Sequence, residues 1–245
     1  PSHGGAAAPT LLTPGGTELI HYATYAYQSS RSGEQRTHMY GSNVMAREPQ
    51  LAPTNPLSSP SGTLTKHIEN YKRVQSPEIN ESLLNRWAGK RKGFSPDQNT
   101  AMNNTSANQA AGASGYPTDA MSWQWLHLIA FTLGGSKDET HPNTKSNLVA
   151  GTAAANGFHL VIENLVKKIV LTKIFEVVEI SAVAHMISGT YHMAHKIVYL
   201  FKCKNKSDSN WKFSREYTIN PLDPNQSAGG DLAFLWAEFV QLSEK

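Results

Sequence analysis

The sequence predicts an α+β fold in which an antiparallel sheet is flanked by helices. Three long runs rich in Val, Ile, Tyr and Phe lie at 173–185, 191–204 and 211–220, with turn signals between them. Such runs are typical of strands joined as an antiparallel meander. Amphipathic stretches before and after them, at 152–170 and 231–242, predict two helices.

The composition is that of a folded chain with aromatic residues to bury. The 245 residues include five Trp, nine Tyr and eight Phe, which argues against intrinsic disorder. No run approaches the roughly 18 apolar residues of a membrane-spanning helix, so we expect no membrane partner. The single cysteine, Cys203, excludes an intramolecular disulfide and a multi-cysteine zinc site. A net charge of +3 permits nucleic-acid binding without requiring it.

We expect two regions with a boundary after residue 118. We expect residues 1–118 to be loop-rich with short helices, and proline with Gly and Ser clusters interrupts residues 1–62 within them. Residues 119–245 carry the long helix and the strand-like runs. Within the first region we expect a strand at 19–27 and a long polar loop at 95–117. Between them we expect two helical pieces, at 64–74 and at 77–88.

The densest basic segment of the chain spans residues 66–92. It holds seven Lys and Arg residues against three Glu residues. Such a segment is either a patch that binds phosphate groups or an ordinary solvated helix face, and both interpretations remain open at this point.

The second region begins with a strand, a loop, a strand and a helix in succession. An apolar strand at 123–133 leads through a polar loop at 134–146 to a short strand at 147–149 and then to the helix at 152–170. At 100° per residue, one side of this helix is an apolar stripe. The stripe consists of Phe158, Val161, Ile162, Leu165 and Ile169. Asn156, Glu163 and Lys167 lie on the opposite side, which is either a plain solvated face or one wall of a site.

Three polar positions give these elements a recognisable pattern: His127 in the first strand, Asn147 before the second, and Asn156 at the helix start. The surrounding segments are Leu126-His127-Leu128-Ile129, Leu133-Gly134-Gly135, Ser146-Asn147-Leu148-Val149 and Ala155-Asn156. Together they resemble the DNA/RNA non-specific endonucleases of the ββα-metal, or His-Me finger, class. The resemblance covers residues 121–170 and extends loosely to 220. Asn147, Asn156 and Glu163 follow His127 by 20, 29 and 36 residues.

The resemblance implies a ββα-metal core and a metal-dependent endonuclease that hydrolyses DNA, RNA or both without sequence preference. His127 would be the general base that takes a proton from water. Asn156 would hold one Mg²⁺, or another divalent cation such as Mn²⁺, with waters completing its shell. Glu163 would hold the waters of that ion, and Asn147 would hydrogen-bond near the base and fix the hairpin.

The chain departs from the family immediately before its histidine. Where the family has Arg-Gly, this chain has Trp125-Leu126. The Arg normally contacts phosphate, so we expect other cations to do so. Arg86 and Arg91 in the basic segment are the candidates, with Lys167 on the polar helix face as a third substrate-binding residue.

The resemblance also suggests a biological context. The chain begins at Pro1 without an initiator Met, and we expect it to be a C-terminal toxin or effector payload. Such a payload is secreted or delivered into a target cell and acts in its cytoplasm or nucleus. An immunity or inhibitor protein would then be a second partner besides nucleic acid.

Three alternatives remain open. The chain can be a catalytically impaired nucleic-acid-binding module on the same fold, or an unrelated α+β domain in which His127 is a core residue. In an HNH-type variant, His127 would pair with His159 on the helix instead. Asp138, Glu139 and His141 in the polar loop can bind a cation or simply face water.

Overall fold

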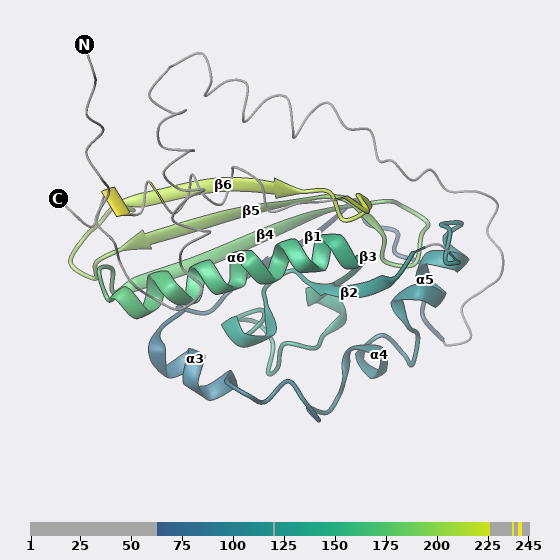
Figure 1. Cartoon of the computed structure of the whole chain (residues 1–245), viewed down its shortest axis with the longest axis horizontal. Helices are drawn as coiled ribbons and strands as arrows, with labels where there is room; N and C mark the ends of the chain where they lie inside the picture. The colour runs from purple at the N-terminus through teal and green to yellow at the C-terminus, as the bar shows by residue number, and fades with distance from the viewer. Residues whose placement is uncertain (1–62, 120, 226–236, 238–239, 242–245) are drawn as a thin grey trace, which may run out of the picture. The chain divides into compact units, whose positions relative to one another are not determined.

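The computed structural model describes residues 63–119 and 121–225, with positions 237, 240 and 241 besides. The chain divides into two compact units, one of Pro1–Ala46 with Gly229–Lys245 and the other of Arg47–Ala228. All strands of the described residues, and the helices labelled in Figure 1, belong to the second unit. The predicted strand at 19–27 and most of the predicted helix at 231–242 lie outside the described residues.

The fold is mixed α+β, as predicted, and its main sheet has four antiparallel strands in the order β1-β4-β5-β6 (Figure 1). Three of these strands are the predicted runs: β4 is Val177–Met186, β5 is Ala194–Lys204 and β6 is Phe213–Ile219. Alternate residues of β4 and β5 are buried, which is the pattern of a sheet with one face against a core. The sequence therefore predicted the meander correctly.

The fourth strand corrects the prediction of a helix at 64–74. Tyr71–Gln75 forms β1, whose Val74 pairs with Ala182 of β4. Its burial alternates with a period of two, because pairing with β4 outweighs the helical tendency of the segment. The strand belongs to the compact unit Arg47–Ala228, which holds residues on both sides of position 118. The expected boundary after residue 118 stays a prediction.

A second, two-stranded sheet lies next to the longest helix. Strand β2, Trp123–His127, pairs antiparallel with β3, Leu148–Thr152, so that His127 lies opposite Leu148. The predicted strand at 123–133 thus ends at His127, and its remainder turns into a short 3₁₀ helix, Phe131–Leu133. Helix α6, Ala153–Thr172, starts directly after β3, where the Thr152 hydroxyl accepts a hydrogen bond from the Ala155 amide.

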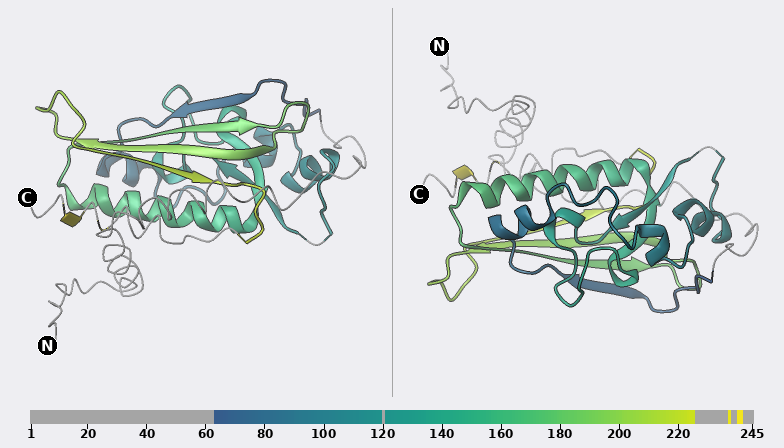
Figure 2. Two further views of the ribbon diagram at one scale, coloured as in Figure 1. Left: turned by 90° about the horizontal axis from the view of Figure 1, so that it is seen from above. Right: turned by 90° about the horizontal axis from the view of Figure 1, so that it is seen from below.

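Helix α6 lies between the main sheet and the segments that carry α3 and α4 (Figures 1 and 2). Its apolar stripe is buried as predicted, except that Val161 is only half-buried. The opposite side is not an ordinary solvated face, because Glu163 is also buried. Neighbouring elements therefore cover this side of α6 at the position of Glu163.

Three short helices lie in the described part of the chain between β1 and β2. They are α3, Glu81–Trp87, α4, Gln98–Ala101, and α5, Ala107–Ala113. The last two replace the long loop predicted at 95–117. Asp97 and Ser106 cap them, and Ser106 forms a capping box with Gln109. This local signal for a helix was present in the sequence.

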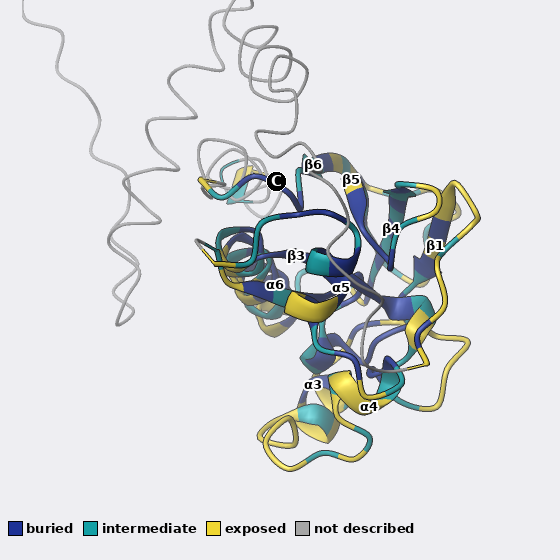
Figure 3. Ribbon diagram, turned by 90° about the vertical axis from the view of Figure 1, so that its right-hand side faces the viewer, coloured by how far each residue is buried: buried dark blue, intermediate teal, exposed yellow. Residues whose placement is uncertain are grey.

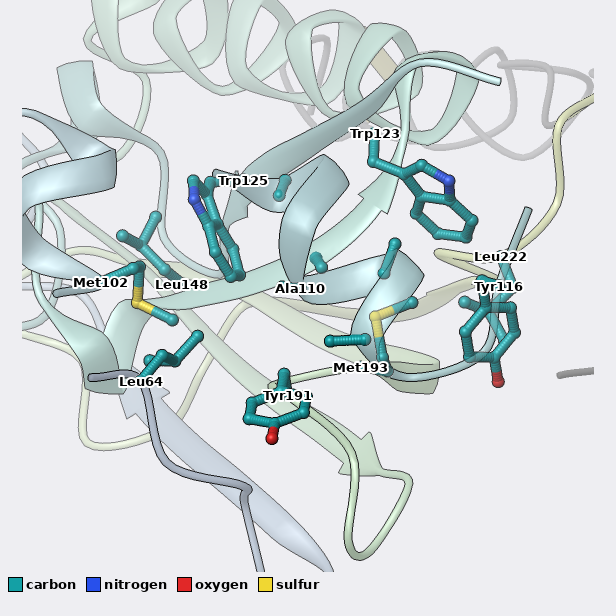
Figure 4. Close-up of a cluster of buried hydrophobic side chains, with 14 residues drawn as sticks. Leu64, Met102, Ala110, Tyr116, Trp123, Trp125, Leu148, Tyr191, Met193 and Leu222 are labelled. Atoms are coloured by element: carbon teal, nitrogen blue, oxygen red, sulfur yellow. The ribbon is translucent and has the colours of Figure 1, made fainter. Parts of the chain in front are cut away.

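The core beside β2 fixes the orientation of that strand. Trp123 and Trp125 project into a buried cluster with Ala110 of α5 and Met193 (Figure 4). The Trp125 indole donates a hydrogen bond of 3.0 Å to the Thr105 carbonyl. Figure 3 shows the contrast between this interior and the exposed turn that follows α3. None of the helices in the described part of the chain is long and apolar enough to span a membrane.

Candidate functional site

His127 is enclosed at the end of β2. The side chain is 6% exposed, and each ring nitrogen faces a carboxamide. The Nε2 atom lies 2.8 Å from Oδ1 of Asn143, and Nδ1 lies 3.3 Å from Nε2 of Gln98. The expected general base is therefore in place at the strand end, but it is covered rather than open to solvent.

The two carboxamides determine which ring nitrogen carries the proton. The Asn143 Nδ2 donates to the Pro96 carbonyl at 2.8 Å, which leaves its oxygen facing the ring. The Gln98 Nε2 donates one hydrogen to the Trp125 carbonyl at 2.9 Å, and its second hydrogen is available to Nδ1 of His127. His127 is therefore protonated on Nε2 and has its lone pair on Nδ1.

Neither Asn143 nor Gln98 was singled out in the sequence. Both lay in segments predicted to be loops, and they are 16 and 29 positions away from His127. No local pattern marks such partners. Gln98 is the first residue of α4 and Asn143 lies in the loop between β2 and β3, so only the folded chain brings them to the ring.

The surroundings of His127 keep its ring uncharged at neutral pH. The pKa of His127 is lowered to about 4, mainly by burial and to a smaller extent by the positive charge of Arg91. The hydrogen bond to Asn143 and the negative charge of Glu163 act in the opposite direction. A neutral imidazole is the form that accepts a proton, but water must displace one of the two carboxamides to reach it.

Asn147 ties the two ends of the loop between β2 and β3. Its Oδ1 accepts from the Ile129 amide at 2.8 Å, while its Nδ2 donates to the carbonyls of Ile129 and Pro142, each at 2.9 Å. The side chain is fully buried. The Asn147 side chain thus continues the hydrogen bonding between the two segments beyond the end of the β2–β3 pair. Its hydrogen bonds go to the loop and not to His127.

Gly135 lets the same loop close on Pro142. Its φ is +69°, and an added Cβ would lie 2.6 Å from the Pro142 Cα. Any larger residue would therefore both strain the backbone and push away the loop segment that carries Asn143.

Asn156 is held by Gln124 and not by the partners of His127. Its Nδ2 donates to Oε1 of Gln124 at 2.5 Å. Because side chains alternate along a strand, Gln124 and His127 point to opposite sides of β2. The structure therefore does not bring Asn156 into the hydrogen-bond network of His127.

Glu163 and Lys167 form an ion pair within α6. The Lys167 Nζ lies 2.6 Å from Oε1 of Glu163, which also accepts a hydrogen bond from the Thr132 hydroxyl. The lysine is half-buried. Its ammonium is thus paired with Glu163 while part of the side chain stays exposed. The expected role of Lys167 in phosphate binding stays a prediction.

His159 lies between α6 and the main sheet. Its ring contacts the Tyr199 hydroxyl of β5. Burial lowers the pKa of His159 to about 3, and the charge of His127 acts in the same direction. The two rings influence each other electrostatically, but the hydrogen bond of His159 points to the sheet, which does not support an HNH-type pair.

Arg86 and Arg91 are exposed, and within the described residues neither takes part in an ion pair. Arg91 lies close enough to His127 to lower its pKa. At the position of the family's Arg, by contrast, Trp125 is buried in the core, and Leu126 after it is fully buried. Of the two arginines, Arg91 in the turn after α3 is thus the one whose charge acts on His127.

The donor set of this region suits a hydrated cation and not a fully protein-bound one. Across the described ranges, no group of three or more His, Cys, Asp or Glu residues is placed to hold a metal ion. In the polar loop, the Glu139 carboxylate accepts a hydrogen bond from Ser146. The Oδ1 of Asn156 accepts no hydrogen bond from a described residue, and a single amide oxygen fits Mg²⁺, which keeps most of its waters.

Comparisons of the chain with protein families, with curated proteins and with solved structures gave no match. The functional assignment therefore rests on the residues and their geometry.

Proposed function

We propose that the chain is a Mg²⁺- or Mn²⁺-dependent endonuclease without sequence preference, with β2, β3 and α6 as a ββα-metal core. One observation supports this proposal most. A neutral His127 ends the first strand of a strand–loop–strand–helix unit whose helix carries Asn156 and Glu163 on one side.

His127 is the general base in this proposal. When a water molecule replaces the Gln98 amide, Nδ1 takes one of its protons and the hydroxide attacks phosphorus. The P–O bond to the leaving oxygen then breaks, and that oxygen takes a proton from solvent. Asn143 holds the proton on Nε2 throughout, so that Nδ1 remains the basic atom.

Asn156 would hold the cation through Oδ1. The bound ion supplies stabilisation of negative charge in the transition state. Gln124 accepts the amide hydrogen of Asn156 and so fixes which atom of the carboxamide is left as a ligand. Glu163 contributes a buried negative charge that is shared with Lys167.

Exposed cations of the turn after α3 bind the phosphate backbone. Lys90, Arg91 and Lys92 follow one another on the surface, and Arg86 precedes them at the end of α3. Contacts to phosphate carry no sequence information, which agrees with cleavage of DNA or RNA at any sequence. In this proposal, these cations contact phosphate in place of the family's arginine, whose position is occupied by Trp125 in this chain.

A plasmid-nicking assay tests the proposal. Cleavage by the full chain should require Mg²⁺ or Mn²⁺ and stop with a chelator. His127→Ala should abolish it with the fold intact by circular dichroism, and Asn156→Ala should raise the Mg²⁺ requirement or abolish activity. The control is His195→Ala at an exposed position of β5. Unchanged turnover in both site variants would remove this site from consideration.

A nucleic-acid-binding module without catalysis is the second candidate. Two observations favour it: His127 is covered by carboxamides, and the family's Arg position is occupied by a core tryptophan. Retention of labelled DNA or RNA by the wild-type chain, with no cleavage at any divalent-ion concentration, would select this candidate.

We further propose that the activity serves as a toxin or effector payload, secreted or delivered into a target cell and neutralised in the producer by an immunity protein. The proposal rests on the family resemblance. Induced expression inside a bacterial cell should degrade nucleic acid and stop growth, whereas the His127→Ala chain should not.

A further inference from the structure

Lys72 is a buried lysine with a complete set of partners. It lies on β1, is 7% exposed, and its ammonium meets three acceptors. These are the carbonyls of Lys145 and Leu148, at 2.6 and 2.7 Å, and the His192 Nδ1, at 2.6 Å. In the sequence it was counted in the basic segment, but its burial removes it from any phosphate-binding surface.

The two carbonyls flank Asn147. Lys145 opens the 3₁₀ turn Lys145–Asn147, and Leu148 is the first residue of β3. Asn147 in turn holds Ile129 and Pro142 at the two ends of the loop. Since Asn143 follows Pro142 directly and faces the His127 ring, a continuous chain of contacts runs from Lys72 to His127.

We propose that Lys72 is a positioning residue, whose side chain fixes the Asn147 turn and thereby the loop that places Asn143 against His127. The catalytic part of this inference rests on the proposed function, whereas the positioning part does not. An apolar residue in its place would leave the buried Leu148 carbonyl and the partly buried Lys145 carbonyl without this donor.

The charge state of Lys72 does not decide whether these contacts form. The pKa of Lys72 is lowered to about 7, mainly by burial; Glu69 opposes this shift and the charge of Lys145 adds to it. A protonated amine donates to all three acceptors. A neutral amine still donates to both carbonyls and accepts a hydrogen bond from a His192 ring protonated on Nδ1.

Lys72→Met tests the proposal, with Lys66→Met as the matched control because Lys66 is exposed and precedes the same strand. The first readout is hydrogen exchange of the Ile129 amide, which reports the Asn147 contact without reference to activity. The second is steady-state cleavage. We expect Lys72→Met to speed this exchange and to lower kcat, each by about tenfold or more, with KM within about twofold of wild type.

Unchanged Ile129 exchange in folded Lys72→Met protein would overturn the proposal, and so would faster exchange with unchanged kcat. If the wild-type chain cleaves no nucleic acid, the proposed function fails, and exchange alone decides whether Lys72 positions the loop.

If Lys72→Met does not fold, the proposal is tested instead by native-state hydrogen exchange of the wild-type chain. The Ile129 amide should then open together with the Ser76 amide, which bonds the Ile180 carbonyl next to β1. A separate opening of Ile129 at lower free energy, with Ser76 still protected, would contradict the proposal.

Discussion

The amide oxygen of Asn143 lies 2.8 Å from Nε2 of His127 and accepts a hydrogen bond from the Nε2–H group. The Asn143 amide is held in this orientation by its own hydrogen bond to the Pro96 carbonyl. A side chain in the middle of a polar loop therefore sets the tautomer of the proposed base. It does so without carrying a charge, which leaves burial to dominate the pKa of the ring.

Asn143→Asp should raise the pKa of His127 from about 4 by roughly one to three pH units, because a carboxylate beside Nε2–H stabilises the imidazolium. The measurement is an NMR titration of the ring, and the acid limb of the cleavage profile should move with it. Asn99→Asp, at an exposed position of α4, is the control. A ring that titrates as in the wild type would show that Asn143 does not contact it in solution.

Arg91→Ala should weaken binding of DNA and RNA about equally and leave kcat almost unchanged. Loss of one phosphate contact should also reduce the slope of log affinity against log salt by about 1. Affinity at several salt concentrations measures this, with Lys206→Ala in the exposed β5–β6 turn as the control. Equal effects of the two substitutions would mean that the turn after α3 is no specific phosphate site.

The free energy of unfolding should fall as the pH is lowered below about 6.5. Burial lowers the pKa values of His127, His159 and His192 to about 4, 3 and 2, whereas the unfolded chain protonates these rings near 6.5. The unfolded state thus binds more protons. The contribution of these three rings to the free energy of unfolding is fully present above pH 6.5 and is lost as the pH falls toward the folded pKa values. Each ring contributes a slope of about 1.4 kcal/mol per pH unit. Urea unfolding at pH 7.5, 6 and 5 measures the sum, and a flat profile would contradict the burial of these rings.

Gly135→Ala should destabilise the fold by roughly 1–3 kcal/mol, since φ is +69° and the new Cβ would lie 2.6 Å from the Pro142 Cα. Gly157→Ala is the matched control. Gly157 lies inside α6 with nothing within 4 Å of an added Cβ, so alanine there should stabilise by about 0.5–1 kcal/mol. Chemical denaturation compares the two variants. Equal behaviour would mean that the loop does not close tightly on Gly135.

The regular elements with a strong local period were predictable. The strands β4, β5 and β6 were identified by their content of Val, Ile, Tyr and Phe and by the turn signals between them, and the helix α6 by its apolar stripe. Strand β1 and the helices α4 and α5 were missed, because they are short. Pairing with Ala182 determines the conformation of Val74 in β1, and no neighbour along the chain does.

By itself, the sequence determined the meander, the long helix and the order of His127, Asn147, Asn156 and Glu163 along the unit that contains them. Only the tertiary structure decided what each of these side chains touches. The ring of His127 meets residues 16 and 29 positions away, and the ammonium of Lys72 meets a carbonyl 76 positions away. Periodicity reports which side of an element is apolar, but a polar side chain is buried or exposed according to elements far along the chain, as Glu163 and Lys72 show.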